Sequence, residues 1–169
     1  MRYFISGHRD ITIKEFQRYY AKPISNAVMK DPNNSEFVVG DYYGVDAMAQ
    51  EYLAHLIQSY PNVKVIVYHM FDKPRNNFYK FSTKGGFTDD HARDSAMTND
   101  SDADIAWVRS GKKNSGTEQN IVRRKVQSLL YLGEFEYSIG LLQGMCNLMQ
   151  KHPNNENNYK LTITVESNQ

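Results

Sequence analysis

Residues 93–120 read RDSAMTNDSDADIAWVRSGKKNSGTEQN. The polar run over 89–99 predicts a helix, and residues 104–108 form a short apolar run typical of a buried strand. A turn at Gly116-Thr117 then opens a second helix, which we expect to reach about residue 132. This order places a helix N-terminus, with its free backbone N–H groups, just beyond the carboxyl end of a strand. Phosphates and other anions bind at such positions.

Strands and helices alternate through the chain on either side of this segment. Short apolar runs predict strands over residues 3–6, 36–40 and 63–68. Apolar residues three and four apart predict helices over 13–29, where Pro23 implies a kink or two shorter helices, and over 45–59. The alternation indicates an α/β protein with a mainly parallel sheet, whose strands end at one common edge.

The remaining segments carry less regular patterns. Residues 71–86 have no period, and we expect a long loop of the kind that often serves as a lid or binding loop. Residues 134–151 predict a further apolar helix, followed by a polar linker and a final strand over 159–165. A chain of 169 residues fits a single domain over 1–169. The spare apolar helix leads us to expect a homo-oligomer.

The composition argues against several classes of protein. A formal net charge of +1 gives no electrostatic case for bulk nucleic-acid binding, although a local basic patch stays open. Cys146 is the one cysteine, so no internal disulfide can form, and a reducing cytoplasmic setting fits best. The apolar part of the N-terminus is too short for a signal peptide. No apolar stretch approaches the length of a membrane span.

Glycine turns follow the first two strands. Gly7 lets a ligand approach the backbone, and Arg9 offers paired hydrogen bonds to a phosphate or carboxylate. The alternative is a tight turn with a surface arginine. Gly40 and Gly44 flank the turn into the helix over 45–59, and Asp46 falls in that helix's first turn. Asp46 either complements the helix dipole or binds a ribose hydroxyl or base edge.

The remaining candidates come from residues 93–120. Arg93 lies on the helix before the strand over 104–108 and is a candidate to face the pocket. Ser115 and Gly116 are small enough for close backbone approach, and Thr117 offers a hydroxyl or a helix cap. Glu118 is a candidate general base or nucleophile for N-glycosidic chemistry. Its alternative interpretation is an ordinary acid in the first turn of a helix.

No pattern in the chain predicts a metal or a cofactor. The five histidines are scattered and show no ligand spacing. The phosphate loop GxxxxGK[ST] and the dinucleotide fingerprint GxGxxG are both absent. ATP hydrolysis and nicotinamide redox chemistry are therefore disfavoured.

Five motifs in order carry a resemblance to a known family: Ser6-Gly7-His8-Arg9, Gly40-Asp41-x-x-Gly44-Val45-Asp46, Arg93-x-x-x-Met97, Ser101-Asp102-Ala103 and Gly116-Thr117. Over about residues 2–130 this succession resembles the SLOG superfamily, and most of all its small stand-alone bacterial and phage members. The resemblance implies a Rossmann-like three-layer domain with about five strands that binds a nucleotide-derived ligand. Residues 134–169 match no motif, and we expect them to form a C-terminal extension of a helix and a strand.

The same superfamily includes LOG-type phosphoribohydrolases, which release a base from a nucleoside monophosphate. Arg93, Met97, Gly116 and Thr117 fit their signature, but Asp94 stands where that family has a lysine. Residues 109–114 replace its Pro-Gly-Gly loop. The chain is more distantly similar to nucleoside deoxyribosyltransferases, which also place a helical glutamate after a glycine-threonine turn. In this chain Glu118 follows Thr117 directly, so its acid is displaced from the position that both families use.

Three hypotheses about function follow. The first is a binding protein that senses, carries or sequesters a nucleotide or a nucleotide-derived small molecule. The second is an N-glycosidase or nucleoside glycosyl transferase that uses Glu118, with Asp46 as the alternative carboxylate. The third is a structural or partner-binding module.

Overall fold

A computed structural model of the protein describes residues 1–112 and 114–131. The chain divides into two compact units, Met1–Ser128 and Leu129–Gln169, and the fold described below is that of the first. The helix predicted over 134–151 and the strand predicted over 159–165 lie outside the described residues, as does Cys146.

The described part is built on one sheet of five parallel strands, in the order β4-β3-β2-β1-β5. The strands are β1 (Arg2–Ser6), β2 (Glu36–Gly40), β3 (Lys64–Met70), β4 (Ser82–Phe87) and β5 (Ala103–Ala106). The predicted α/β class with a parallel sheet is therefore confirmed. Because all five strands run the same way, their carboxyl ends meet at one edge.

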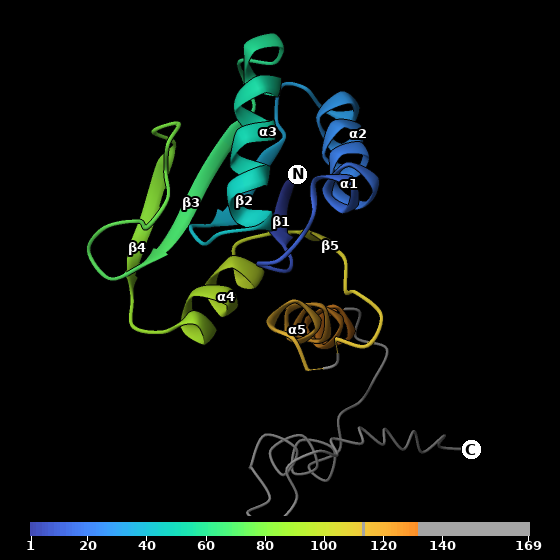
Figure 1. The fold of residues 1–169 in the computed structure, drawn as a ribbon, viewed down its shortest axis with the longest axis vertical. Coiled ribbons are helices and arrows are strands. Elements are labelled where there is room, and N and C mark those ends of the chain that lie inside the picture. Colours follow the sequence, from blue (N-terminus) through green and yellow to red (C-terminus); the bar gives the residue numbers. More distant parts are fainter. Residues whose placement is uncertain (113, 132–169) are drawn as a thin grey trace, which may run out of the picture. The chain divides into compact units, whose positions relative to one another are not determined.

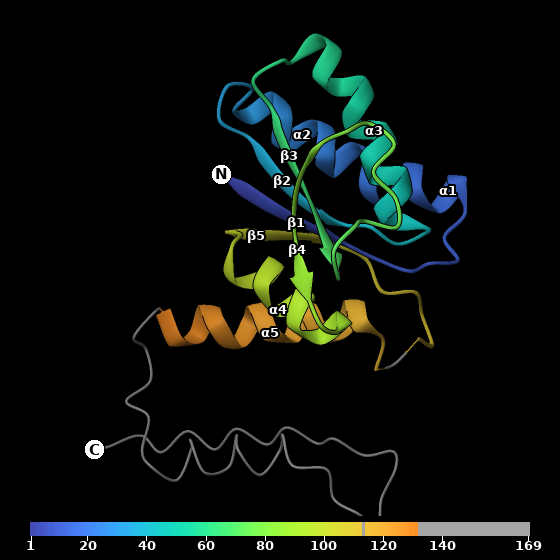
Figure 2. The same ribbon diagram turned by 90° about the vertical axis from the view of Figure 1, so that its left-hand side faces the viewer.

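Helices cover both faces of this sheet (Figures 1 and 2). One face carries α1 (Ile13–Phe16), the π-helical turn η1 (Gln17–Ala21), α2 (Lys22–Lys30) and α3 (Val45–Ser59). The other carries α4 (Asp90–Asn99) and α5 (Gly116–Tyr131). Pro23 lies in the first turn of α2, directly after the wide turn η1. The chain thus stays helical and absorbs the missing proline N–H by widening one turn.

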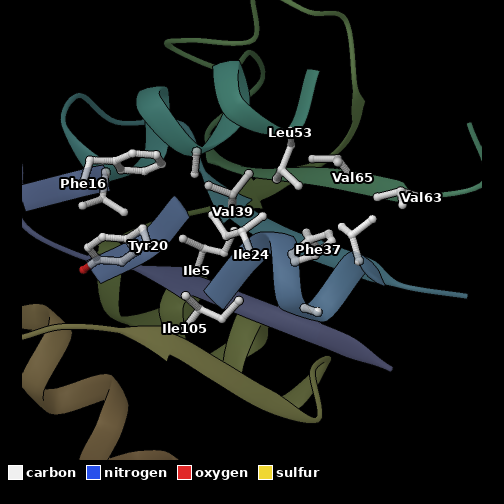
Figure 3. Close-up of a cluster of buried hydrophobic side chains, with 14 of the residues drawn as sticks. Ile5, Phe16, Tyr20, Ile24, Phe37, Val39, Leu53, Val63, Val65 and Ile105 are labelled. Carbon is white, nitrogen blue, oxygen red and sulfur yellow. The ribbon is translucent and has the colours of Figure 1, made fainter. Parts of the chain in front are cut away.

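The larger core lies between the sheet and the helices α1 to α3 (Figure 3). Strand residues alternate between the two faces, so Ile5 enters this core while Phe4 packs on the other side with Met97 of α4. The Tyr20 hydroxyl donates to the Ser6 carbonyl at 3.0 Å and accepts from the Trp107 N–H at 3.0 Å. This buried tyrosine therefore joins the carboxyl ends of β1 and β5.

One strand corrects the sequence-based prediction. Residues 71–86 were expected to form a loop, but Ser82–Phe87 is the edge strand β4 and the connecting loop ends at residue 81. This strand reads STKGGF and is largely exposed, so it carries no hydrophobic alternation. It forms because the free edge of β3 supplies hydrogen-bond partners, and local sequence does not reveal such partners.

Candidate functional site

Three of the loops that leave the carboxyl edge of the sheet contact one another. Gly44 has a φ of +75°, and a Cβ added there would lie 2.5 Å from the Arg9 Cα. The next residue, Val45, donates its N–H to the His8 carbonyl at 3.2 Å. The Arg109 N–H, from the segment after β5, donates to His8 Nε2 at 2.9 Å. The loops after β1, β2 and β5 therefore form one continuous surface.

The loop between β3 and β4 reaches the same edge through Arg75 and Asn76. Asn76 Nδ2 donates to the Asp41 carbonyl at 2.9 Å. Gln50 Nε2, from α3, donates to both the Gly40 carbonyl (3.0 Å) and the Asn76 carbonyl (3.3 Å). These bonds tie this loop to the end of β2.

Asp41 lies at the centre of this contact and is fully buried. Arg75 binds it through the backbone N–H and Nε to Oδ2, at 2.7 and 3.1 Å, and through Nη2 to Oδ1 at 2.6 Å. Burial alone would raise the pKa of Asp41, but the hydrogen bonds from Arg75 outweigh burial and lower that pKa. Asp41 is therefore a buried carboxylate that keeps its charge.

Arg93 is also buried, on α4, and lies among carboxylates. Its Nη1 is 3.0 Å from Asp90 Oδ1 and 3.5 Å from Asp41 Oδ1, and its Nη2 is 2.9 Å from Asp94 Oδ1. Asp94 accepts a further hydrogen bond from Asn120 Nδ2 at 3.1 Å. Arg93 therefore connects the end of β2 with the start of α5.

Asp46 lies in the first turn of α3, and the turn after β2 wraps around its carboxyl group. The Tyr42 N–H donates to its Oδ2 at 3.1 Å, and a Cβ at Gly40 would lie 2.2 Å from the same oxygen. Burial raises the pKa of Asp46 to about 6, against the opposing attraction of Arg93 and the Tyr42 N–H. A carboxyl group that titrates near neutral pH is suited to exchange a proton with a ligand.

Arg9 is exposed beside this turn. Within residues 1–112 and 114–131, its side chain makes no hydrogen bond or ion pair. A guanidinium that binds none of these residues is available to an anionic ligand at the carboxyl edge.

Residues 115–118 lie at the start of α5. Ser115 Oγ accepts from the Glu118 N–H at 3.2 Å, and Glu118 Oε2 accepts from the Asn114 N–H at 2.5 Å. These two bonds cap the helix, and they give Glu118 the alternative role stated above, that of an acid in the first turn of a helix. Thr117 is buried, whereas Gly116 is exposed, and outside its own helix backbone and chain neighbours no atom of the described residues lies within 4 Å of its Cβ position.

The structure thus brings most of the predicted site residues to one edge of the sheet. Gly7, Arg9, Gly40, Gly44, Asp46 and Arg93 lie there together. In the described part of the chain, no hydrogen bond joins residues 115–118 directly to Asp46 or Arg9, and the connection runs through Asn120 and Asp94. A separate hollow of about 280 Å³ beside α1 contains none of the predicted residues.

Several residues of this edge were not predicted. Asp41 directly follows a strand that ends in glycine, and that position was a usable signal. The sequence carries no such signal for Arg75, Asn76 and Gln50, because their partners are 34, 35 and 10 residues away in the chain.

Two buried polar atoms at this edge have no hydrogen-bond partner among the described residues: Ser6 Oγ and Gln50 Oε1. By the alternation of β1, Ser6 lies on the same face as Phe4, which is the face that α4 covers. A buried hydroxyl without a partner is costly unless something else binds it. Ser6 is therefore a further candidate ligand contact.

Neither a scan against protein-family models nor a search among curated proteins finds a match for this chain. Within residues 1–112 and 114–131, no cluster of three or more His, Cys, Asp or Glu side chains could hold a metal ion. In the same residues, no helix is long and apolar enough to cross a membrane.

Proposed function

We propose that this protein binds a nucleotide or a nucleotide-derived small molecule at the carboxyl edge of its sheet, as a sensor, carrier or sequestering protein. The observation that carries the proposal is the convergence of Arg9, Asp46 and Arg93 from three different segments on that edge. Ligands of open parallel sheets bind at this edge.

The charges of this edge match the parts of a nucleotide. The exposed Arg9 guanidinium can bind phosphate oxygens in a forked geometry. The first turn of α5, with Gly116 and Thr117, has backbone N–H groups that favour an anion, and it is linked to this edge through Asn120, Asp94 and Arg93. Asp46 can accept a hydrogen bond from a ribose hydroxyl. The charge of Arg93 is balanced by carboxylates, so its proposed role is to hold the surrounding side chains of the site in place.

Calorimetric titration with the four common nucleoside monophosphates tests this proposal. We expect binding to the wild type and a loss of about tenfold or more in affinity for Arg9→Ala, because one charge-assisted pair contributes roughly 1.5–3 kcal/mol. Lys30→Ala removes an exposed cation at the end of α2 and serves as the matched control. Binding that Arg9→Ala and Thr117→Ala both leave unchanged would place the ligand elsewhere.

A second candidate function is hydrolysis or transfer at an N-glycosidic bond. The pKa of about 6 at Asp46 favours it, because a base is most effective when its pKa lies near the working pH. In hydrolysis, water would add across the bond between the sugar C1′ and the base nitrogen and release the free base. Chromatography of each monophosphate after incubation tests this candidate, and we expect Asp46→Asn to abolish any release. If no substrate releases a free base, this candidate is wrong and binding is the only proposed function.

We also propose that the protein works in the cytoplasm as a homo-oligomer. The single cysteine supports a reducing compartment, and the apolar helix predicted over 134–151 supports self-association. Light scattering on the full chain after size-exclusion chromatography tests whether the protein is an oligomer. A mass equal to one chain at micromolar concentration would contradict it.

A further inference from the structure

Tyr43 is a large aromatic side chain that the fold leaves in solvent. It occupies the turn between β2 and α3, and 65% of its surface is exposed. The backbone on either side of it is closely packed, because Gly40 packs against Asp46 and Gly44 packs against the backbone of Arg9.

The Tyr43 ring contacts Tyr42, which in turn contacts Arg75. The Tyr43 ring meets the Tyr42 ring edge to face, with 5.4 Å between centroids and an interplanar angle of 68°. The Arg75 guanidinium lies over the Tyr42 ring, 4.4 Å from its centroid. Arg75 is in turn fixed by the buried Asp41. Tyr43 is therefore supported by a chain of contacts that begins at a buried charge.

The same turn carries the polar groups assigned above to the ligand. The Tyr42 N–H donates to Asp46 Oδ2, and Gly44 touches Arg9. Tyr43 thus follows directly after the residue whose N–H binds the carboxyl group proposed for the sugar, and it precedes the glycine that touches the Arg9 backbone. The turn that binds Asp46 therefore also carries an exposed aromatic ring, which is available to a base attached to a sugar at Asp46.

We infer that Tyr43 stacks on the aromatic base of the bound nucleotide. The inference rests on the proposed function and narrows its ligand class to molecules that keep an intact base. Every nucleobase has a π-face, so stacking separates ligands with a base from ligands without one and discriminates little among bases. An aromatic ring supported from behind loses little conformational freedom when the base binds.

Calorimetry with adenosine 5′-monophosphate and ribose 5-phosphate tests the inference on the wild type, Tyr43→Ala and Tyr43→Phe. We expect Tyr43→Ala to bind the nucleotide at least tenfold more weakly, as base stacking on one aromatic ring usually implies, and to bind ribose 5-phosphate as the wild type does. Tyr43→Phe keeps the ring and should bind both as the wild type does. Phe78→Ala removes a ring that is 74% exposed outside this turn and is the matched control.

The outcomes separate this inference from the proposed function. If the wild type binds the nucleotide and Tyr43→Ala binds it equally well, the stacking role is wrong and the site stands. If Tyr43→Ala loses both ligands to the same degree, the ring holds the turn together and the inference is again wrong. If the wild type binds neither ligand, the proposed function fails and the inference fails with it.

Discussion

The buried Asp41 and the partly exposed Arg75 form a two-point ion pair that joins the end of β2 to the loop between β3 and β4. Arg75 Nη2 lies 2.6 Å from Asp41 Oδ1, and Arg75 Nε lies 3.1 Å from Asp41 Oδ2. Arg93 approaches the same carboxylate at 3.5 Å. Two cations from different elements therefore meet at one buried acid.

Asp41→Ala is expected to lower the free energy of unfolding by about 2–3 kcal/mol. Breaking a buried pair leaves its partner charge uncompensated, and the partial exposure of Arg75 moderates that cost. Chemical denaturation at pH 7 measures the change. Asp72→Ala, on the exposed part of the same loop, is the control and should unfold as the wild type does. Equal stability of the two variants would show that the pair is not structural.

Asp46 should make the folded state less stable as pH rises from about 4 to 6. Its folded pKa of about 6 lies above the unfolded value, so the folded state binds more protons in that window and stability falls with rising pH. Asp46→Asn removes this dependence. The free energy of unfolding of the variant, relative to that of the wild type, should rise by about 1–3 kcal/mol between pH 4 and pH 7. Urea denaturation of both proteins across this range measures the gain, and a constant difference would contradict the raised pKa.

Glu118→Ala should destabilise the start of α5 and leave ligand chemistry unchanged. The lost bond to the Asn114 N–H and the lost first-turn charge together cost about 1 kcal/mol. Thermal unfolding measures this loss, with the exposed Glu51→Ala on α3 as control. If Glu118→Ala instead keeps full stability and abolishes base release, Glu118 is catalytic after all.

Substitution by alanine should lower the stability at Gly7 and leave it unchanged or raise it at Gly116. A Cβ at Gly7 would lie 2.3 Å from Val45 Cγ2 and 2.4 Å from the Tyr20 hydroxyl, so Gly7→Ala should cost about 2–3 kcal/mol by overpacking. At Gly116, apart from its chain neighbours and its own helix backbone, no atom of residues 1–112 and 114–131 lies within 4 Å of the added carbon. Gly116→Ala should therefore be neutral or stabilising by up to about 1 kcal/mol, because alanine favours a helix. Denaturation midpoints of the two variants measured side by side check both expectations.

Local patterns in the sequence were sufficient for most of the fold. The strand over residues 36–40 and the helix over 45–59 have the predicted bounds, because an apolar run and a helical period are properties of neighbouring residues. The convergence of Gly7, Arg9, Gly40 and Asp46 also follows from topology alone, since parallel strands end at one edge. The strand β4 could not be predicted, because its exposed residues have no pattern and its stability comes from pairing with β3.

The sequence by itself therefore determined the α/β class, the order of most elements and the edge at which polar residues gather. Only the tertiary structure decided what each polar side chain does there. In the folded structure Asp41 pairs with Arg75, 34 residues later in the chain, and Glu118 caps α5. The fold also raises the pKa of Asp46 by burial. Ion pairing and desolvation depend on distances between residues far apart in the chain, and only the folded arrangement sets those distances.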